Sequence, residues 1–146
     1  MGQQQLLLLV LATVIVGLAT VAGIQAFDQG QSQAANDALT QRAVSIASDI
    51  QGQANKPGQL GGLPDPNAEE SSYDATTEEV ANAIGLETDK GIEASGAGDG
   101  AQCNIITQNG HPAVQCAGGN AETSVTAEVT GLETGDISTS FGTATL

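Results

Sequence analysis

The sequence predicts an α+β protein in which one long N-terminal α-helix packs against a small antiparallel β-sheet. The first observation is an apolar run without any charge from Leu6 to Phe27. The second is an apolar stripe with helical spacing, which continues to Asn55 with no proline before Pro57. The third is a set of short alternating segments after residue 100. A chain of 146 residues has room for this helix and one small domain.

The apolar run is long enough to cross a membrane. Its 22 residues span about 33 Å as a helix, close to the roughly 30 Å hydrocarbon core of a bilayer. Its polar side chains are Thr13, Thr20 and Gln25 alone. The large apolar ones are Leu6, Leu7, Leu8, Leu9, Val10, Leu11, Val14, Ile15, Val16, Leu18, Val21, Ile24 and Phe27.

Three interpretations of this run compete. A cleaved secretory signal has a basic start and an apolar stretch of about 7–15 residues, whereas residues 1–5 carry no Lys or Arg and the run is longer. A simple membrane anchor fits the length, although no basic flank sets its orientation. The third interpretation, which we favour, is the first half of a longer helix with a second role.

The helical pattern continues past Phe27 as an amphipathic segment. Its apolar positions recur three or four residues apart, as on one face of a helix, at Ala35, Leu39, Ala43, Ile46 and Ile50. Lys56-Pro57-Gly58 then ends the pattern. We therefore predict one helix from about Gln3 to Asn55, with an apolar part (1–27) and an amphipathic part (28–56).

This arrangement resembles the type IV pilins, through residues 1–55. The likeness consists of a short polar start, an apolar stretch, an amphipathic continuation and then a Gly-rich loop before a small β-region. It implies a non-enzymatic filament subunit that sits in the inner membrane before assembly. It also implies a prepilin peptidase, an assembly machinery, and packing of Leu6–Phe27 against other copies in an extracellular filament. A minor pilin or pseudopilin and a monomeric single-span surface protein are the alternatives.

The start of the chain departs from the family pattern. Pilins usually have a basic leader that ends in glycine, and a glutamate at the fifth mature position. If the chain is already processed, Gln5 stands at that position. If cleavage follows Gly2, Gln3 becomes the N-terminus and Leu7 is fifth. The carboxylate is absent in both cases, and Gln5 offers a neighbour's N-terminal amine a weaker, uncharged acceptor.

Two glycines interrupt the apolar run, Gly17 and Gly23. Each costs about 1 kcal/mol in a helix relative to alanine. Two compatible reasons are open. One is local bending when the helix leaves the membrane, and the other is close packing of helices through small residues.

Residues 57–100 are expected to form a Gly- and Pro-rich loop with one short helix. Thr76 and Glu79 have the spacing of a capping box, and Gly85 is the expected stop. Residues 91–100 are expected to be a flexible connection.

Residues 101–146 are expected to form an antiparallel region of about four strands. Asn109-Gly110 is the preferred two-residue hairpin turn, and counting outward from it places Cys103 opposite Cys116 at a non-hydrogen-bonded site. The Cα atoms there lie about 4.5 Å apart, which suits a structural disulfide. Neither a redox pair, which favours C-x-x-C spacing, nor a metal site with His111 fits as well.

The remaining strands follow from alternation and from one proline. Pro112 should lie on an edge strand, because it lacks an N–H group. Residues 123–130 alternate as a half-buried strand, and 137–146 form a weaker partner with Ile137 and Phe141. The apolar face of this sheet should pack on the stripe from Leu39 to Ile50.

Charge and composition exclude several functions. Seventeen acidic and three basic residues give a net charge of −14, which disfavours nucleic-acid binding by a basic patch. A surface of this kind is similar to those of halophile proteins, or of an acidic secreted protein. The single histidine, His111, lies in a turn region and is expected to be solvated. No pattern predicts a catalytic residue, a metal site or a cofactor.

Overall fold

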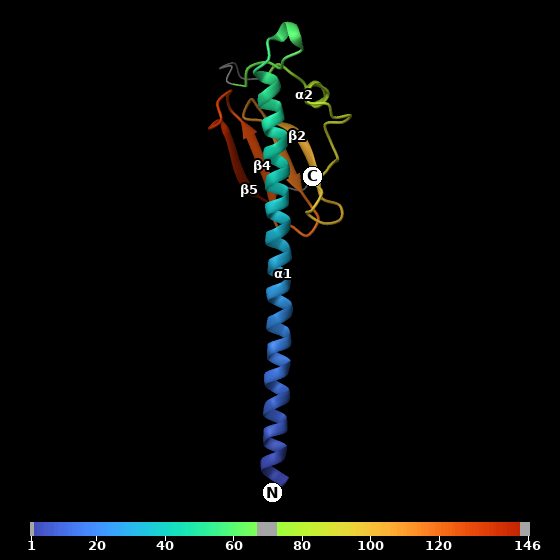
Figure 1. Ribbon diagram of the computed structural model, residues 1–146, viewed down its shortest axis with the longest axis vertical. Helices are drawn as coiled ribbons and strands as arrows, with labels where there is room; N and C mark the ends of the chain where they lie inside the picture. Colours follow the sequence, from blue (N-terminus) through green and yellow to red (C-terminus); the bar gives the residue numbers. More distant parts are fainter. Residues whose placement is uncertain (1, 67–72, 144–146) are drawn as a thin grey trace.

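The computed structural model describes residues 2–66 and 73–143. A single helix, α1 (Gly2–Ala54), runs the length of the molecule, and a small β-domain packs against its C-terminal half (Figure 1). The N-terminal half projects away from the domain (Figure 1). The whole of α1 has 53 residues and, at 1.5 Å per residue, spans about 80 Å. The predicted α+β class and the long helix are confirmed, with both helix ends within one residue of the prediction.

The C-terminal half of α1 forms one side of the hydrophobic core. The buried positions recur at helical spacing, so that one face of the helix meets the sheet. The predicted stripe is among them, and the side chains of Leu39 and Ile50 are 0% exposed. The buried residues of α1 are Ala35, Leu39, Ala43, Ile46, Ala47, Ile50, Gln51 and Ala54.

The sheet has five antiparallel strands in the order of the sequence, one more than predicted. The strands are β1 (Ile92–Glu93), β2 (Gln102–Gln108), β3 (His111–Ala117), β4 (Ser124–Val129) and β5 (Ile137–Gly142). The extra strand, β1, lies in the segment expected to be a flexible connection. Ile92 pairs with Cys103, and its side chain is buried. This one buried apolar side chain holds the short strand at the edge of the sheet.

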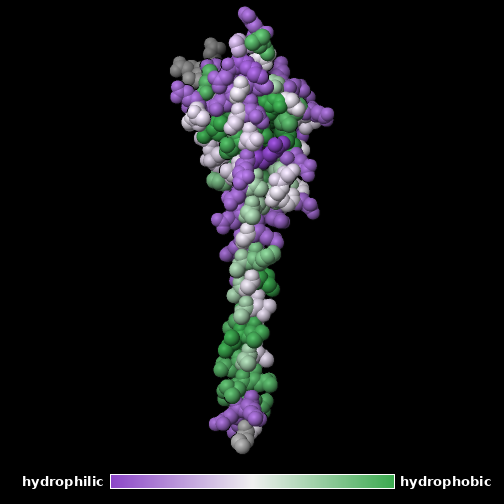
Figure 2. Space-filling view, in the orientation of Figure 1, coloured by the Kyte–Doolittle hydropathy of each residue, from purple (hydrophilic) through white to green (hydrophobic). Residues whose placement is uncertain are grey.

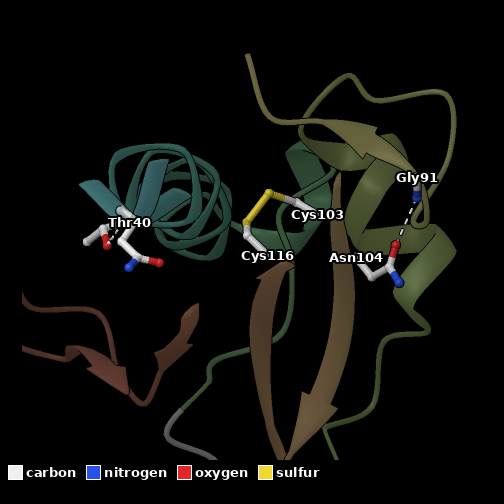
Figure 3. The surroundings of a disulfide bond; sticks show 6 residues. Thr40, Gly91, Cys103, Asn104 and Cys116 are labelled. Carbon is white, nitrogen blue, oxygen red and sulfur yellow. Dashed lines mark hydrogen bonds between the residues drawn. A yellow bond between two sulfur atoms is a disulfide. The ribbon is translucent and has the colours of Figure 1, made fainter. Parts of the chain in front are cut away.

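The hairpin of β2 and β3 has the predicted register. Asn109 and Gly110 both have positive φ, 51° and 84°, as the turn requires. Cys103 lies opposite Cys116, and the two form a disulfide with a Cα–Cα distance of 4.0 Å. Both cysteines are fully buried in the core, and Figure 3 shows the disulfide on the side of the hairpin that faces α1.

The prediction that Pro112 marks an edge strand is wrong. β3 is interior, since it pairs with β2 on one side and β4 on the other. The proline is tolerated because the β3–β4 pairing begins one residue later, at Ala113 opposite Glu128. β4 is also more buried than the expected half, and Ser124 and Thr126 are only 4% and 8% exposed.

The connection between helix and sheet contains two short helical segments. A 3-10 turn, η1 (Gly58–Leu60), follows α1. The predicted capping box is present at α2 (Thr77–Ala83), where the Thr76 hydroxyl accepts from the Glu79 N–H and the Glu79 carboxylate accepts from the Thr76 N–H. Gly85, with φ 80°, ends this helix as predicted. Residues 67–72 of the predicted loop and 144–146 of the predicted last strand lie outside the described residues.

Side-chain hydrogen bonds, which the sequence did not predict, fix the helix to the loops at both ends of β4. The Gln51 amide donates to the carbonyl oxygens of Gly131 and Glu133, at 2.9 and 2.7 Å. At the other end of the domain, the Thr123 hydroxyl donates to the Asn36 side-chain oxygen at 3.0 Å. β4 therefore runs beside the part of α1 between Asn36 and Gln51.

Candidate functional site

The candidate site is the apolar surface of the N-terminal half of α1, residues 6–27. Thirteen large apolar side chains on it are exposed, from 52% for Leu11 to 69% for Leu7. Figure 2 shows this surface as a nearly continuous apolar stem below a mainly hydrophilic domain. The exposed set is Leu6, Leu7, Leu8, Leu9, Val10, Leu11, Val14, Ile15, Val16, Leu18, Val21, Ile24 and Phe27, the residues singled out in the sequence.

The apolar surface of this half is too large to be an ordinary water-exposed surface of a soluble monomer. Transfer of one such side chain out of water stabilises a structure by about 1.5–3 kcal/mol. Summed over the set, and scaled to the exposed fraction, the gain is as large as the roughly 5–15 kcal/mol that keeps a whole domain folded. A soluble monomer rarely exposes more than a few hundred Å² of contiguous apolar surface. Larger exposed patches of this kind mark contacts with a membrane or with other protein, which makes this half of α1 the candidate site.

The two threonine hydroxyls within the apolar half are satisfied inside the helix. The Thr13 hydroxyl donates to the Val10 carbonyl at 2.8 Å, and the Thr20 hydroxyl donates to the Val16 carbonyl at 2.7 Å. The helix also pairs its own backbone groups, as an apolar environment requires, and Gln25 is the other polar side chain of this half. This helix is long and apolar enough to span a membrane, by length and composition.

Gly17 and Gly23 lie within unbroken helix, and a Cβ atom at either would meet nothing within 4 Å. Nothing inside the described chain therefore requires a glycine at these positions. The predicted bending and the predicted close helix packing both need surroundings beyond one copy, and both stay predictions.

The first turn of α1 holds the predicted processing and contact residues Gly2, Gln3 and Gln5, all of them exposed. The first N–H groups of a helix have no acceptor within it, and no acidic side chain is present in this turn to accept from them. The described part of this turn is therefore polar and carries no charged side chain. Met1 lies outside the described residues.

The net charge is confined to the rest of the molecule. All seventeen acidic and three basic residues follow Phe27. Asp28 is the first of them, and it directly follows the apolar half. The molecule is therefore divided into an apolar stem without charged side chains and a strongly acidic domain.

The β-domain offers little that resembles a chemical site. Among residues 2–66 and 73–143 no cluster of three His, Cys, Asp or Glu side chains is placed to hold a metal ion. His111 is not the solvated residue expected, because its Nδ1 lies 2.6 Å from the Pro66 carbonyl oxygen and joins the loop to the sheet. Burial raises the pKa of Tyr73 to about 12, so its phenol is neutral at physiological pH.

Phe141 is more exposed than the sequence predicts. Phe141 on β5 was expected to belong to the apolar face of the sheet, yet its side chain is 62% exposed. α1 covers chiefly β3 and β4 and reaches less of β5. The alternation of the strand could not reveal where that cover ends.

Comparison of the chain with protein-family models, with curated proteins and with solved structures finds no match in any of the three.

Proposed function

We propose that the chain is the structural, non-enzymatic subunit of an extracellular type IV pilus-like filament. In this role the apolar half of α1 spans the inner membrane before assembly and packs against the same half of other copies afterwards. The proposal includes a prepilin peptidase and a pilus assembly machinery as partners. It requires no cofactor.

One observation carries the proposal: a single unbroken helix has a covered half and a bare half. The half from Ala35 to Ala54 is fixed to the domain by buried side chains and by the hydrogen bonds of Gln51. The half from Leu6 to Phe27 has no contact with the domain, and its side chains are exposed all round. A bare all-apolar surface suits a bundle, in which each helix has neighbours on every side.

The distribution of charge supports the same arrangement. In a filament with the stems inside and the domains outside, the stems bring no charge into the interior, and the acidic domains face solvent. Screening by salt reduces the repulsion between domains, with a Debye length of about 8 Å at physiological ionic strength. A minor pilin and a monomeric single-span protein share the stem but predict no abundant filament.

The test is a charge within the stem. Val10→Asp or Val14→Asp places a carboxylate on the apolar surface, at a cost of about 2.5–3.5 kcal/mol per copy on the membrane-insertion scale. We expect filaments sheared from the cell surface to disappear. Gln59→Asp is the matched control, since it adds the same charge to the exposed η1 turn at the far end of the molecule.

Three results are informative. Filaments that contain the chain in the unmodified protein and the control, but not in the stem variants, support the proposal. Normal filaments from Val10→Asp contradict it. Recovery of the unmodified chain from membranes alone, with no filament in sheared material, contradicts it in favour of the single-span alternative.

A further inference from the structure

Outside α1, two large apolar side chains of the described residues are exposed, Leu60 (76%) and Phe141 (62%). They lie at opposite ends of the domain. Leu60 is in the η1 turn, beyond the C-terminal end of α1. Phe141 pairs with Val125 near the start of β4, at the end of the domain held to Asn36. Phe141 is therefore at the end of the domain nearer the bare stem.

The register of β5 fixes the side of the sheet to which Phe141 belongs. Directly opposite residues of two paired strands lie on the same face. Phe141 is opposite Val125, and Thr139 is opposite Ala127. Val125 and Ala127 are 0% exposed in the core that the sheet forms with α1. Phe141 and Thr139 thus lie on the α1 side of the sheet, at its margin, where the helix of the same chain no longer covers them.

β5 also lacks the features that usually protect an edge strand. Within the described residues it pairs with β4 alone. Edge strands are commonly protected by charged side chains, proline or bulges. Residues 137–146 contain no charge and no proline, in a chain of net charge −14. An uncharged edge with an exposed phenylalanine is suited to contact another apolar surface.

We propose that Phe141 and the α1 side of β5 form a seat for the apolar half of α1 of a second copy. The inference rests on the proposed filament and adds to it a contact between domain and stem. The seat lies at the end of the domain from which the stem of the same chain projects. The stem of the neighbour supplies the matching chemistry, a surface of Leu, Val and Ile without charge.

The other occupants fit less well. The stem of the same chain cannot fold back, because α1 is unbroken from Gly2 to Ala54. Lipid is too far away. The seat begins beside Asn36, nine residues beyond Phe27, which corresponds to about 14 Å along the helix axis. A bilayer that holds Leu6–Phe27 ends below it.

The same geometry predicts how neighbouring copies are offset. For Phe27 of a second copy to reach the seat, that copy must be displaced along the axis by about 14 Å or more toward the domain. A larger offset brings Ile24 or Leu18 there instead. Staggered subunits of this kind are what a helical filament contains, so the contact residue measures the stagger.

A photoreactive phenylalanine analogue at position 141 tests the contact. Filaments are assembled from a mixture of unlabelled and ¹⁵N-labelled full chains, irradiated and digested with trypsin. Lys56 precedes proline, which leaves Arg42 and Lys90 as the cleavage sites. We expect an adduct of mixed isotope that joins the peptide 91–146 of one copy to the peptide ending at Arg42 of another. The same analogue at position 60 should give no such adduct.

An adduct to lipid, to another region of a second copy, or within one chain overturns the inference, as does the absence of any adduct in assembled filaments. Fragmentation of the expected adduct should place it between Leu6 and Phe27. An attachment between residues 28 and 42 also overturns it.

Substitution provides the second test. Phe141→Asp should lower the yield of sheared filaments at least tenfold, while Phe141→Leu should keep it within about twofold. Because Phe141 is 62% exposed, the Asp variant should retain its disulfide and its thermal unfolding temperature in detergent. Leu60→Asp is the control, since it also replaces an exposed large apolar side chain, 76% exposed, by aspartate, and it should assemble normally.

The outcomes separate this inference from the proposed function. If Val10→Asp abolishes filaments while Phe141→Asp forms them normally, the stem bundle stands and the seat is wrong. If Phe141→Asp and Leu60→Asp fail equally, added charge rather than position is responsible, and the seat is again wrong. If Val10→Asp itself forms normal filaments, the proposed function fails first.

Discussion

The two halves of α1 are one continuous helix in two different environments. In the C-terminal half, Leu39 is 0% exposed and contacts the sheet, whereas in the N-terminal half Leu9 is 63% exposed and has no partner in the chain. In proteins most helical stability comes from tertiary packing rather than from propensity. The C-terminal half has that packing within its own domain. The N-terminal half has no such packing within the chain, and in the proposed function lipid or other copies provide it.

Apolar residues therefore have two separate roles in this chain. Those of the stripe build a small core with few large side chains, which the Cys103–Cys116 disulfide and the hydrogen bonds of Gln51 reinforce. Those of the stem contribute nothing to this core. A change in the stem should therefore leave the stability of the domain intact, and a change in the core should leave the apolar surface of the stem intact.

Removal of the stem should give the largest effect. We expect a chain that begins at Asp28 to be a soluble monomer without detergent, because all thirteen exposed stem side chains are gone and the net charge is still −14. Light scattering coupled to gel filtration measures its mass, and calorimetry measures its unfolding. A fragment that aggregates or unfolds below 30 °C would show that the stem supports the domain, and that the halves are not independent.

The same truncation of the side chain in each half should separate stability from assembly. Leu39→Ala removes a fully buried side chain, and we expect it to lower the free energy of unfolding of the domain by about 2–5 kcal/mol. Leu9→Ala should leave this free energy within about 0.5 kcal/mol but lower filament yield. Calorimetry of the full chain in detergent and quantification of sheared filaments measure the two effects. A loss of domain stability in Leu9→Ala would break the comparison.

Most of the fold could be predicted from the sequence, because its strongest signals are local or periodic. The extent of α1 followed from apolar spacing and from Pro57. The position of Cys103 opposite Cys116 followed from the Asn109-Gly110 turn alone. The capping box at Thr76 depends on residues three apart, so that it also needed no tertiary information.

The misses depend on which strands lie side by side. Pro112 predicted an edge, but β4 pairs with β3 from the next residue onward, and a local rule cannot reveal that neighbour. β1 has only two residues, too few for alternation to show. The Gln51 side chain bonds to Gly131 and Glu133, which lie 80 and 82 positions further along the chain. Of the candidate site, the sequence identified the whole stem. It could not identify Phe141 as exposed, because exposure there depends on where α1 stops covering β5.

The smallest expected effect concerns pH, and it separates the halves once more. No side chain between Leu6 and Phe27 titrates. In the domain, the backbone N–H and hydroxyl of Thr76 bond to the Glu79 carboxylate and lower its pKa below the ordinary 4.5. The folded pKa lies below the unfolded one, so that the contribution to stability is full above about pH 4.5 and is lost as pH falls through the folded value.

We therefore expect Glu79→Gln to reduce the acid-induced fall in the unfolding temperature of the domain below pH 4.5, measured by calorimetry from pH 7 to pH 3. Glu78→Gln is the control, because it removes the same charge next door without a bond to Thr76. Equal changes in both variants would mean that net charge, rather than the capping box, sets the response. Since the stem has nothing to protonate, the contacts between stems should be unaffected over the same range. Any acid-induced loss of filaments in Glu79→Gln must then begin in the domains or at the start of the chain.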